Sequence, residues 1–225
     1  SFYDPNTATF ERDQLRYTGF DFNSAPCPDV IPSDRLFSET DVASGDPSSI
    51  QGIIEDKGGL VIFKDSSVYA LTISDNPETW IRYTISKSDG LYAPKTLGKL
   101  PEGRGIYFGD VDHFKMITNQ RVVVLTNSIP STYYNLTNKA TLRAFYDKID
   151  GSICIVDGAT RLFYRGYLDL AYQMPDQKNA IPWYPCYAGH NLEFSAIERD
   201  GSVISGSQTS PFLFYKWHKT DYTFG

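Results

Sequence analysis

Two aspartates and a histidine stand close together in the sequence and are candidates for binding a metal ion. They are Asp110, Asp112 and His113, and carboxylate oxygens and imidazole nitrogens are common metal ligands. Their spacing matches neither the loop of an EF-hand calcium site nor the ligand pairs of a zinc site. We therefore predict that the protein binds no metal ion and needs no cofactor.

The sequence lacks the motifs that mark common classes of hydrolases and nucleotide-binding enzymes. It has no Gly-x-Ser-x-Gly elbow, no His-Glu-x-x-His motif and no phosphate-binding loop. The segment from Ile73 to Trp80 partly resembles the Asp-box of sialidases, Ser-x-Asp-x-Gly-x-Thr-Trp. It keeps Asp75, Thr79 and Trp80 but has isoleucine at the serine position and Pro77 at the glycine position. The partial motif occurs once, and we predict no catalytic residues and no enzymatic activity.

Aromatic residues make up 15% of the chain, with 16 tyrosines, 14 phenylalanines and 3 tryptophans. Aromatic rings either pack in a protein core or offer a flat face to a ligand such as a sugar. For Trp80, Trp183 and Trp217 we expect packing within the fold. A glycan-binding, lectin-like attachment protein remains the alternative function, with Trp80 and Trp183 as the positions to test.

The length and net charge of the chain exclude further classes of protein. The 225 residues are enough for one large domain. The chain has 27 acidic and 21 basic residues and a net charge of −6, whereas general nucleic-acid-binding domains carry a basic excess. The longest apolar stretches, such as Val122 to Leu125, are far too short to span a membrane. We expect no membrane insertion and no secretory signal.

Three cysteines, Cys27, Cys154 and Cys186, are widely spaced and form no Cys-x-x-Cys pair. Cys154 lies within the apolar run Ile153 to Val156 and is predicted to be a small buried residue. We expect three free thiols in a reducing compartment, with a Cys27–Cys186 bridge as the open alternative.

Short strands rich in Val, Ile, Tyr, Phe and Thr, separated by Gly, Asp, Asn and Pro, dominate the sequence. The clearest unit has strands at 59–63, 67–72 and 80–85, which predict an antiparallel meander. Helical periodicity is confined to 131–139 and 140–148. The second stretch also fits a strand, with Leu142, Ala144 and Tyr146 on one face.

The meander recurs at a period of roughly 40 to 50 residues, the length of a four-stranded propeller blade. The later copies are predicted at 105–125, at 142–164 with a strand near Trp183, and at 192–217. We therefore predict an all-β fold, a β-propeller of four-stranded antiparallel blades with four to five blades visible. The whole chain, 1–225, is expected to be one domain: 1–45 supply closing strands, at Thr9-Phe10 and 16–22, and 46–225 supply about four blades. A β-sandwich, which needs no such higher period, is the alternative.

Two windows of the sequence each carry a motif that can be compared with known families. The first places a Gly-Asp and an Ile-x-Gly-Ile before a Leu-x-x-Phe-Lys-x-x-Ser-ϕ-Tyr strand pair, where ϕ is apolar, and the second is Gly-x-x-Ala-Pro-Lys. The matching residues are Gly45, Asp46, Ile50, Gly52, Ile53, Leu60, Phe63, Lys64, Ser67, Val68, Tyr69, Gly90, Ala93 and Pro94. In this order they resemble β-propeller proteins of bacteriophage tails and necks, including the tail hub or nozzle proteins of short-tailed phages. The end of the chain, 219–225, is similar to the exit from the last blade of that family.

Several of these residues also have local roles that do not depend on the resemblance. Gly45 and Gly52 suit turns with positive φ. Asp46 precedes Pro47 and is expected to accept backbone N–H groups in an Asx-turn. Pro94 restricts Ala93 to an extended conformation, which suits the entrance of a strand.

The resemblance implies a structural virion component of a tail hub, nozzle or neck, assembled in the host cytoplasm and located in the viral tail. It implies a homo-oligomeric ring, partners among the portal-side and tail proteins, and viral DNA passing through the channel during ejection. A negative charge suits such a conduit because it does not retain the phosphate backbone. Candidate contact loops are 44–49, 75–78 and 173–184. Known members continue into a further domain, so the resemblance implies a domain or a short member.

Overall fold

The structure is a computed structural model, and strands make up most of its described residues. These are 2–4, 9–11, 14–17, 38–41, 46, 48–74, 79–136, 138–157, 162–168, 181–187, 194–197, 203–206 and 214–217. Helix in this part of the chain consists of one short α-helix, α1 (Pro130–Tyr134), two 3₁₀ turns, η2 (Pro101–Gly103) and η3 (Lys139–Thr141), and single 3₁₀ residues at Thr79 and Leu168. The predicted all-β class is therefore confirmed. No helix among these residues is long and apolar enough to cross a membrane.

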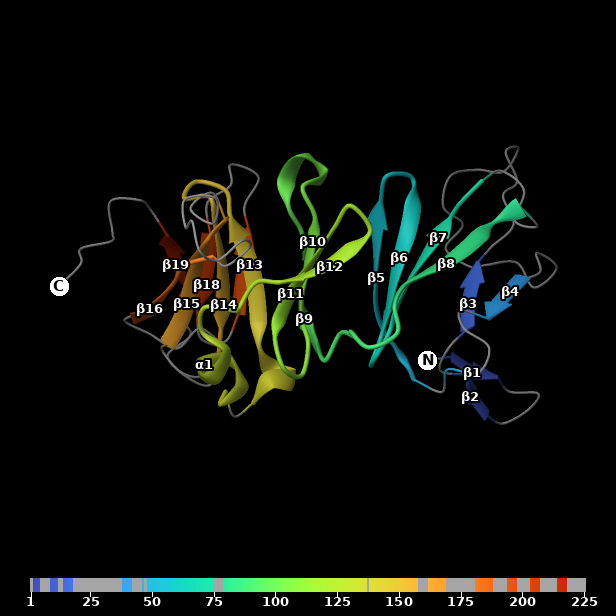
Figure 1. Cartoon of the computed structure of the whole chain (residues 1–225), viewed down its shortest axis with the longest axis horizontal. Helices are drawn as coiled ribbons and strands as arrows, with labels where there is room; N and C mark the ends of the chain where they lie inside the picture. The colour runs from blue at the N-terminus through green and yellow to red at the C-terminus, as the bar shows by residue number, and fades with distance from the viewer. Residues whose placement is uncertain are drawn as a thin grey trace.

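Four antiparallel sheets follow one another along the chain, and neighbouring strands in each sheet are consecutive in sequence. Sheets I, II and III follow one another in chain order across Figure 1, and sheet IV overlaps sheet III in this view. Sheet I contains β5 (Ile50–Asp56), β6 (Gly59–Lys64), β7 (Val68–Thr72) and β8 (Ile81–Ser86). Sheet II contains β9 (Ala93–Lys99), β10 (Ile106–Gly109), β11 (Phe114–Thr118) and β12 (Arg121–Val124). Sheet III contains β13 (Arg143–Asp147), β14 (Ser152–Val156), β15 (Leu162–Tyr167) and β16 (Trp183–Tyr187). Sheet IV contains β17 (Phe194–Ile197), β18 (Val203–Gly206) and β19 (Phe214–Trp217).

The N-terminal part of the chain forms two further two-stranded sheets. One pairs β1 (Phe2–Asp4) with β2 (Thr9–Glu11), and the other pairs β3 (Gln14–Tyr17) with β4 (Ser38–Asp41). The strand expected at Thr9-Phe10 is present in β2. β3 overlaps the strand expected at 16–22 in its first two residues, and 18–22 lie outside the described residues.

Neighbouring sheets pack face to face through apolar side chains. Between sheets I and II the rings of Phe63 and Phe108 lie 5.0 Å apart. Between sheets II and III the Phe114 ring meets Trp183 edge-on at 6.1 Å. Between sheets III and IV, Val203 packs into a cluster with Phe145. Each sheet is therefore buried against the next, as burial of apolar area requires.

The first strands of successive sheets lie next to one another. β5 contacts β9, β9 contacts β13, and β13 contacts β17. Within the described residues the four sheets form an open series and do not close into a ring. The structure therefore establishes the all-β class as a series of packed meanders, three with four strands and one with three. The series has more sheets than the two of a sandwich.

The predicted strands agree closely with sheet III and with the last three strands of sheets I and II. The stretch 140–148, which fitted a helix or a strand, forms strand β13 for most of its length. Leu142, Ala144 and Tyr146 contact the same hydrophobic cluster, as the strand alternative required. Helix is observed at α1, at the start of the stretch 131–139.

β5 was not predicted as a strand, and of β9 only the entrance at Ala93 was expected, because glycines interrupt the apolar pattern of both strands. Gly52 was expected in a turn with positive φ, but it lies within β5 and its φ is not positive. A Cβ on Gly52 would lie 2.8 Å from the side chains of both Leu91 and Leu97, and a Cβ on Gly98 would lie 2.2 Å from the Tyr107 hydroxyl. Both glycines therefore make room for side chains from elsewhere in sheet II and its entry, a constraint that strand propensity does not include.

Candidate functional site

The motif residues that the sequence singled out converge on the carboxylate of Asp46. Its Oδ2 accepts hydrogen bonds from the hydroxyls of Ser67, at 2.5 Å, and Tyr69, at 3.0 Å. The buried Lys64 ammonium donates to the main-chain oxygen of Asp46 at 2.7 Å, and its Nζ lies 3.7 Å from Oδ2. We call Asp46, Lys64, Ser67 and Tyr69 the Asp46 cluster. It fixes the segment that enters sheet I onto the turn between β6 and β7.

Asp46 also makes the predicted Asx-turn. The Ser48 backbone N–H donates to its Oδ1 at 3.0 Å, and the Ser48 hydroxyl donates to the same oxygen. Burial by itself raises the pKa of Asp46. The hydrogen bonds from Ser48, Ser67 and Tyr69 outweigh that effect and hold the pKa well below its ordinary value. The carboxylate is therefore kept ionised as an acceptor in the fold.

The neighbouring residue Asp65, in the β6–β7 turn, also binds the segment that enters sheet I. Its carboxylate accepts from the Ser49 backbone N–H at 2.8 Å and from the Gln51 side-chain amide. Gly90 packs against this turn so closely that a Cβ would lie 2.1 Å from the Asp65 carbonyl oxygen. The backbone at Gly90, just before sheet II, therefore contacts the β6–β7 turn of sheet I so closely that a side chain would not fit.

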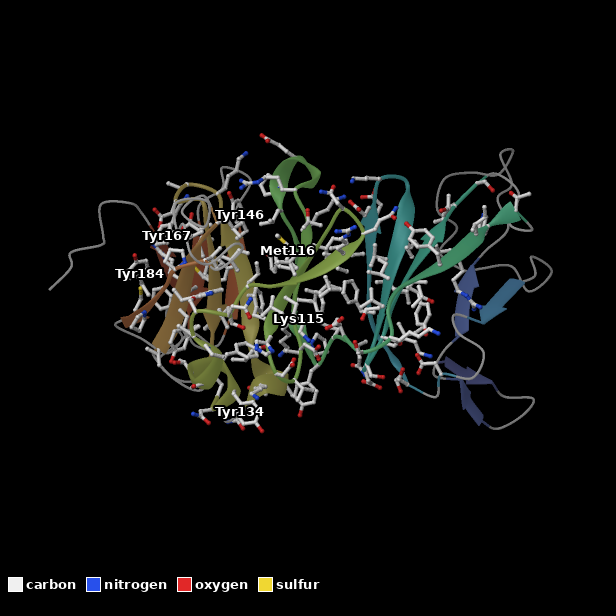
Figure 2. All side chains as sticks on the ribbon, viewed as in Figure 1. Lys115, Met116, Tyr134, Tyr146, Tyr167 and Tyr184 are labelled. Carbon is white, nitrogen blue, oxygen red and sulfur yellow. The ribbon has the colours of Figure 1, made fainter. Side chains whose placement is uncertain are left out.

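A second cluster surrounds Lys115 on β11, whose side chain is only 6% exposed. Its Nζ lies 2.8 Å from Asp89 Oδ1, 2.6 Å from Asp110 Oδ2 and 2.9 Å from Asp112 Oδ1. Three carboxylate acceptors satisfy the three donors of an ammonium group. We call these four residues the Lys115 cluster, and Figure 2 shows Lys115 at the lower end of sheet II.

Burial lowers the pKa of Lys115, but its hydrogen bonds to Asp110, Asp89 and Asp112 outweigh this and raise the pKa well above its ordinary value. Burial also raises the pKa of Asp112, whereas the hydrogen bonds from Lys115 and His113 lower it, with a net value of about 2. The cluster is therefore held as a network of ions.

The two clusters occupy equivalent places in sheets I and II. Asp46 lies four residues before β5 begins, and Asp89 lies four residues before β9 begins. Each accepts a hydrogen bond from the second residue of the third strand of its sheet, which is Tyr69 in β7 and Lys115 in β11. The same device therefore fastens the entry segment of each sheet to its own third strand.

Asp110, Asp112 and His113 are the metal-ligand candidates in the sequence, and their spacing fits neither an EF-hand nor a zinc site. In the structure both aspartates are ion-paired with Lys115, and His113 Nδ1 lies 2.9 Å from Asp112 Oδ2. Within the described ranges no group of His, Cys, Asp or Glu side chains is arranged to hold a metal ion. The cation that these carboxylates bind is the lysine ammonium.

Sheet III carries a different ionic group at its opposite end, near the β13–β14 turn. The Arg165 guanidinium pairs with Asp150 and lies 3.8 Å from the Asp147 carboxylate, and the Tyr167 hydroxyl donates to Asp150 at 3.2 Å. Burial raises the pKa of Asp147 despite the hydrogen bonds and the nearby arginine that lower it. The device of sheets I and II is therefore not repeated by this group.

The other motif residues lie in the packing around the clusters. Phe63 and Val68 are buried between sheets I and II, and Ala93 is buried in the cluster between sheets II and III. Leu60 packs against Ile62, Tyr69 and Leu71 on the face of sheet I that points away from sheet II. Pro94 is exposed on β9. Gly45 lies outside the described residues, as do most of the candidate contact loops 44–49, 75–78 and 173–184.

Two tryptophans that were considered for glycan contact have packing roles. Trp183 is buried between sheets II and III, and its Nε1 donates to the Leu125 carbonyl oxygen at 2.9 Å. The Trp80 indole donates to the Ser74 carbonyl oxygen at 2.8 Å and packs on the outer face of sheet I. Of Trp217 the structure describes the backbone within β19.

Cys154 is buried, as predicted, and Cys154 and Cys186 are both free thiols. Cys27 lies outside the described residues. Burial raises the pKa of Cys154 to about 12 and also raises the pKa of Cys186.

Asp89 and Lys115 are the residues that sequence reasoning missed. They are 26 positions apart, and a β-meander does not reveal which turn a linker crosses. An aspartate beside a glycine occurs at Gly45-Asp46 and at Asp89-Gly90, but the same pair occurs at four other places in the sequence. The pair alone therefore does not identify these two positions.

The sequence matches no protein-family model and no curated protein. Among solved structures it is similar to a protein of unknown function from Bacteroides caccae, with 12% identity and a TM-score of 0.43. The similarity covers 77% of this chain, and the chain spans 58% of that protein's length.

Proposed function

We propose that this chain is a structural component of a bacteriophage tail hub, nozzle or neck. In this proposal sheets I to IV are blades of a β-propeller, and the ring is completed by the rest of the chain or by further copies. Its function is to bind those neighbours and to form part of the conduit through which viral DNA leaves the particle.

The observation that carries the proposal is the convergence of the resemblance residues on the Asp46 cluster. Motifs that match an enzyme family usually gather around a substrate cleft. Here Asp46, Lys64, Ser67 and Tyr69 bond to one another, and Gly90 packs against the adjacent turn. In this chain the residues of the resemblance therefore position sheets, which favours a structural role.

The repetition of the device in sheet II supports the blade interpretation. Blades must meet at a constant angle if a ring is to close, and constant attachment of each entry segment favours a constant angle. The Lys115 cluster provides this attachment with three short ionic contacts. The net charge of −6 is compatible with a channel that does not retain DNA.

Two experiments test the role in the virion. Mass spectrometry of purified phage particles from the source of this sequence should detect the chain in constant proportion to the portal protein. Co-expression of the tagged full chain with the portal and tail proteins of the same genome should yield a stable complex. A chain that is absent from particles and purifies alone would contradict the proposal.

A further inference from the structure

A small hollow opens between sheets I and II, at the end of the sheets opposite to the two aspartate clusters. It has a volume of about 180 Å³ and is lined by the β5–β6 turn, by strands β6, β7 and β8 of sheet I, and by the β11–β12 turn. In Figure 1 the β11–β12 hairpin reaches toward sheet I, and β12 contacts β8.

Small residues create this hollow. Gly59, Ala70, Gly103 and Gly105 line it where larger side chains would fill the space. A Cβ on Gly59 would lie 2.7 Å from the Leu71 carbonyl oxygen, so this position excludes other residues. Ala70 lies directly between Val61 and Tyr83 on neighbouring strands, and its short side chain leaves a depression beside the tyrosine ring.

The rim carries neutral hydrogen-bonding groups and one aromatic ring. The Tyr83 residue is 38% exposed, and Gln120 Nε2 lies 3.5 Å from its hydroxyl oxygen. Thr72, Thr118 and Asn119 add two hydroxyls and an amide. These groups both donate and accept hydrogen bonds.

The backbone holds these groups in fixed positions. Asn119 and Gln120 have φ values of 49° and 61°, which define the tight β11–β12 turn, and Lys57 and Gly58 form the matching β5–β6 turn with φ values of 51° and 77°. Rigid turns reduce the entropy lost when a ligand binds.

Charge at the hollow is balanced. Its two charged lining residues are Asp56 and Lys57, one of each sign. An anionic or cationic ligand would find no surplus of opposite charge in this lining.

We propose that this hollow binds one unit of a neutral saccharide. A sugar ring presents hydroxyl groups that donate and accept, and a C–H face that packs against an aromatic ring such as Tyr83. The volume is smaller than the roughly 300 to 1,000 Å³ of sites for drug-sized ligands, which suits one ring of a longer chain. Neither Trp80 nor Trp183 lines this site. Saccharide binding here does not depend on the proposed role in the phage tail.

The test uses the full chain and named probes. Saturation-transfer difference NMR is recorded with glucose, galactose, mannose and N-acetylglucosamine, each as the monosaccharide and as a short homo-oligosaccharide. Bacterial surface polysaccharide and soluble dextran then distinguish a cell-surface glycan from a free sugar. We expect at least one neutral probe to bind with millimolar or better affinity.

Three variants locate the binding. Tyr83→Ala and Gln120→Ala should each weaken it, Tyr83→Ala by about tenfold for the loss of an aromatic contact. Tyr92→Ala removes an equally exposed tyrosine from the opposite end of the sheets and should leave the affinity unchanged. Circular dichroism confirms that each variant is folded. Failure of every neutral probe to bind, or equal affinity of the wild type and both hollow variants, would overturn the proposal.

Discussion

Lys115 Nζ lies 2.8 Å from Asp89 Oδ1, and this contact joins the third strand of sheet II to the linker that arrives from sheet I. The same ammonium binds Asp110 and Asp112, so one buried side chain fixes both a linker and a turn. The Asp46 cluster does the same for sheet I with the Tyr69 hydroxyl in place of the ammonium. Relative placement of the two sheets therefore depends on a few polar contacts as well as on apolar packing.

Removing the Lys115 ammonium should destabilise the protein strongly. Lys115→Met leaves the buried carboxylate of Asp110 without its ion partner, and the loss of one member of a buried pair costs about 3–5 kcal/mol of unfolding free energy. Urea denaturation followed by circular dichroism measures the change. Lys99→Met is the control, because Lys99 pairs with exposed Glu55 at 3.1 Å and should cost less than about 1 kcal/mol. Equal losses in the two variants would contradict the role of the cluster.

Acid should weaken the protein through the depressed carboxylates. The pKa of Asp112 falls from 3.8 to about 2 on folding, and that of Asp46 also falls well below 3.8. A depressed pKa contributes stability that is complete above the unfolded value and is lost as the pH drops through the folded one. The stability of the wild type should therefore decline between pH 3.8 and about 2.

The Asp46→Asn variant measures how much the Asp46 carboxylate contributes to this loss of stability in acid. Its unfolding free energy should be lower than that of the wild type at neutral pH, and the difference should shrink below pH 3.8 as Asp46 of the wild type becomes protonated. Thermal unfolding across this range measures both. A difference that stays constant with pH would show that the Asp46 charge is irrelevant to stability.

Gly90 should tolerate no side chain. A Cβ at this position would lie 2.1 Å from the backbone of Asp65, so Gly90→Ala must separate the two sheets locally and should cost on the order of 3 kcal/mol. Gly58→Ala is the matched control, because Gly58 has a φ of 77° and no atom within 4 Å of its ideal Cβ. The control pays backbone strain of about 1–2 kcal/mol. A smaller loss for Gly90→Ala than for Gly58→Ala would refute the close approach.

Cys154 should resist alkylation in the folded protein. Burial raises the pKa of its thiol to about 12, so little thiolate forms at mildly alkaline pH. Iodoacetamide treatment followed by peptide mass spectrometry should leave Cys154 unmodified until urea is added, with the half-buried Cys186 reacting earlier. Rapid labelling of Cys154 without denaturant would show that sheet III opens readily.

The strands of sheet III were predictable because each has a dense run of apolar and β-branched residues between turn residues. β5 and most of β9 were not predictable, since Gly52 and Gly98 weaken their pattern. The reason for both glycines lies in side chains that approach from other segments. The Asx-turn at Asp46 was predictable from its neighbour Pro47. Its bonds to Ser67 and Tyr69, and the pairing of Asp89 with Lys115, depend on contacts between distant segments.

Electron cryomicroscopy of the purified full chain, with its mass in solution measured on the same sample, tests the central claim most directly. The account predicts a ring, complete in one chain or completed by copies, in which β5, β9, β13 and β17 surround a common axis. Sheets that do not surround an axis in any assembly that the chain forms would contradict the propeller and the proposed role in the phage tail.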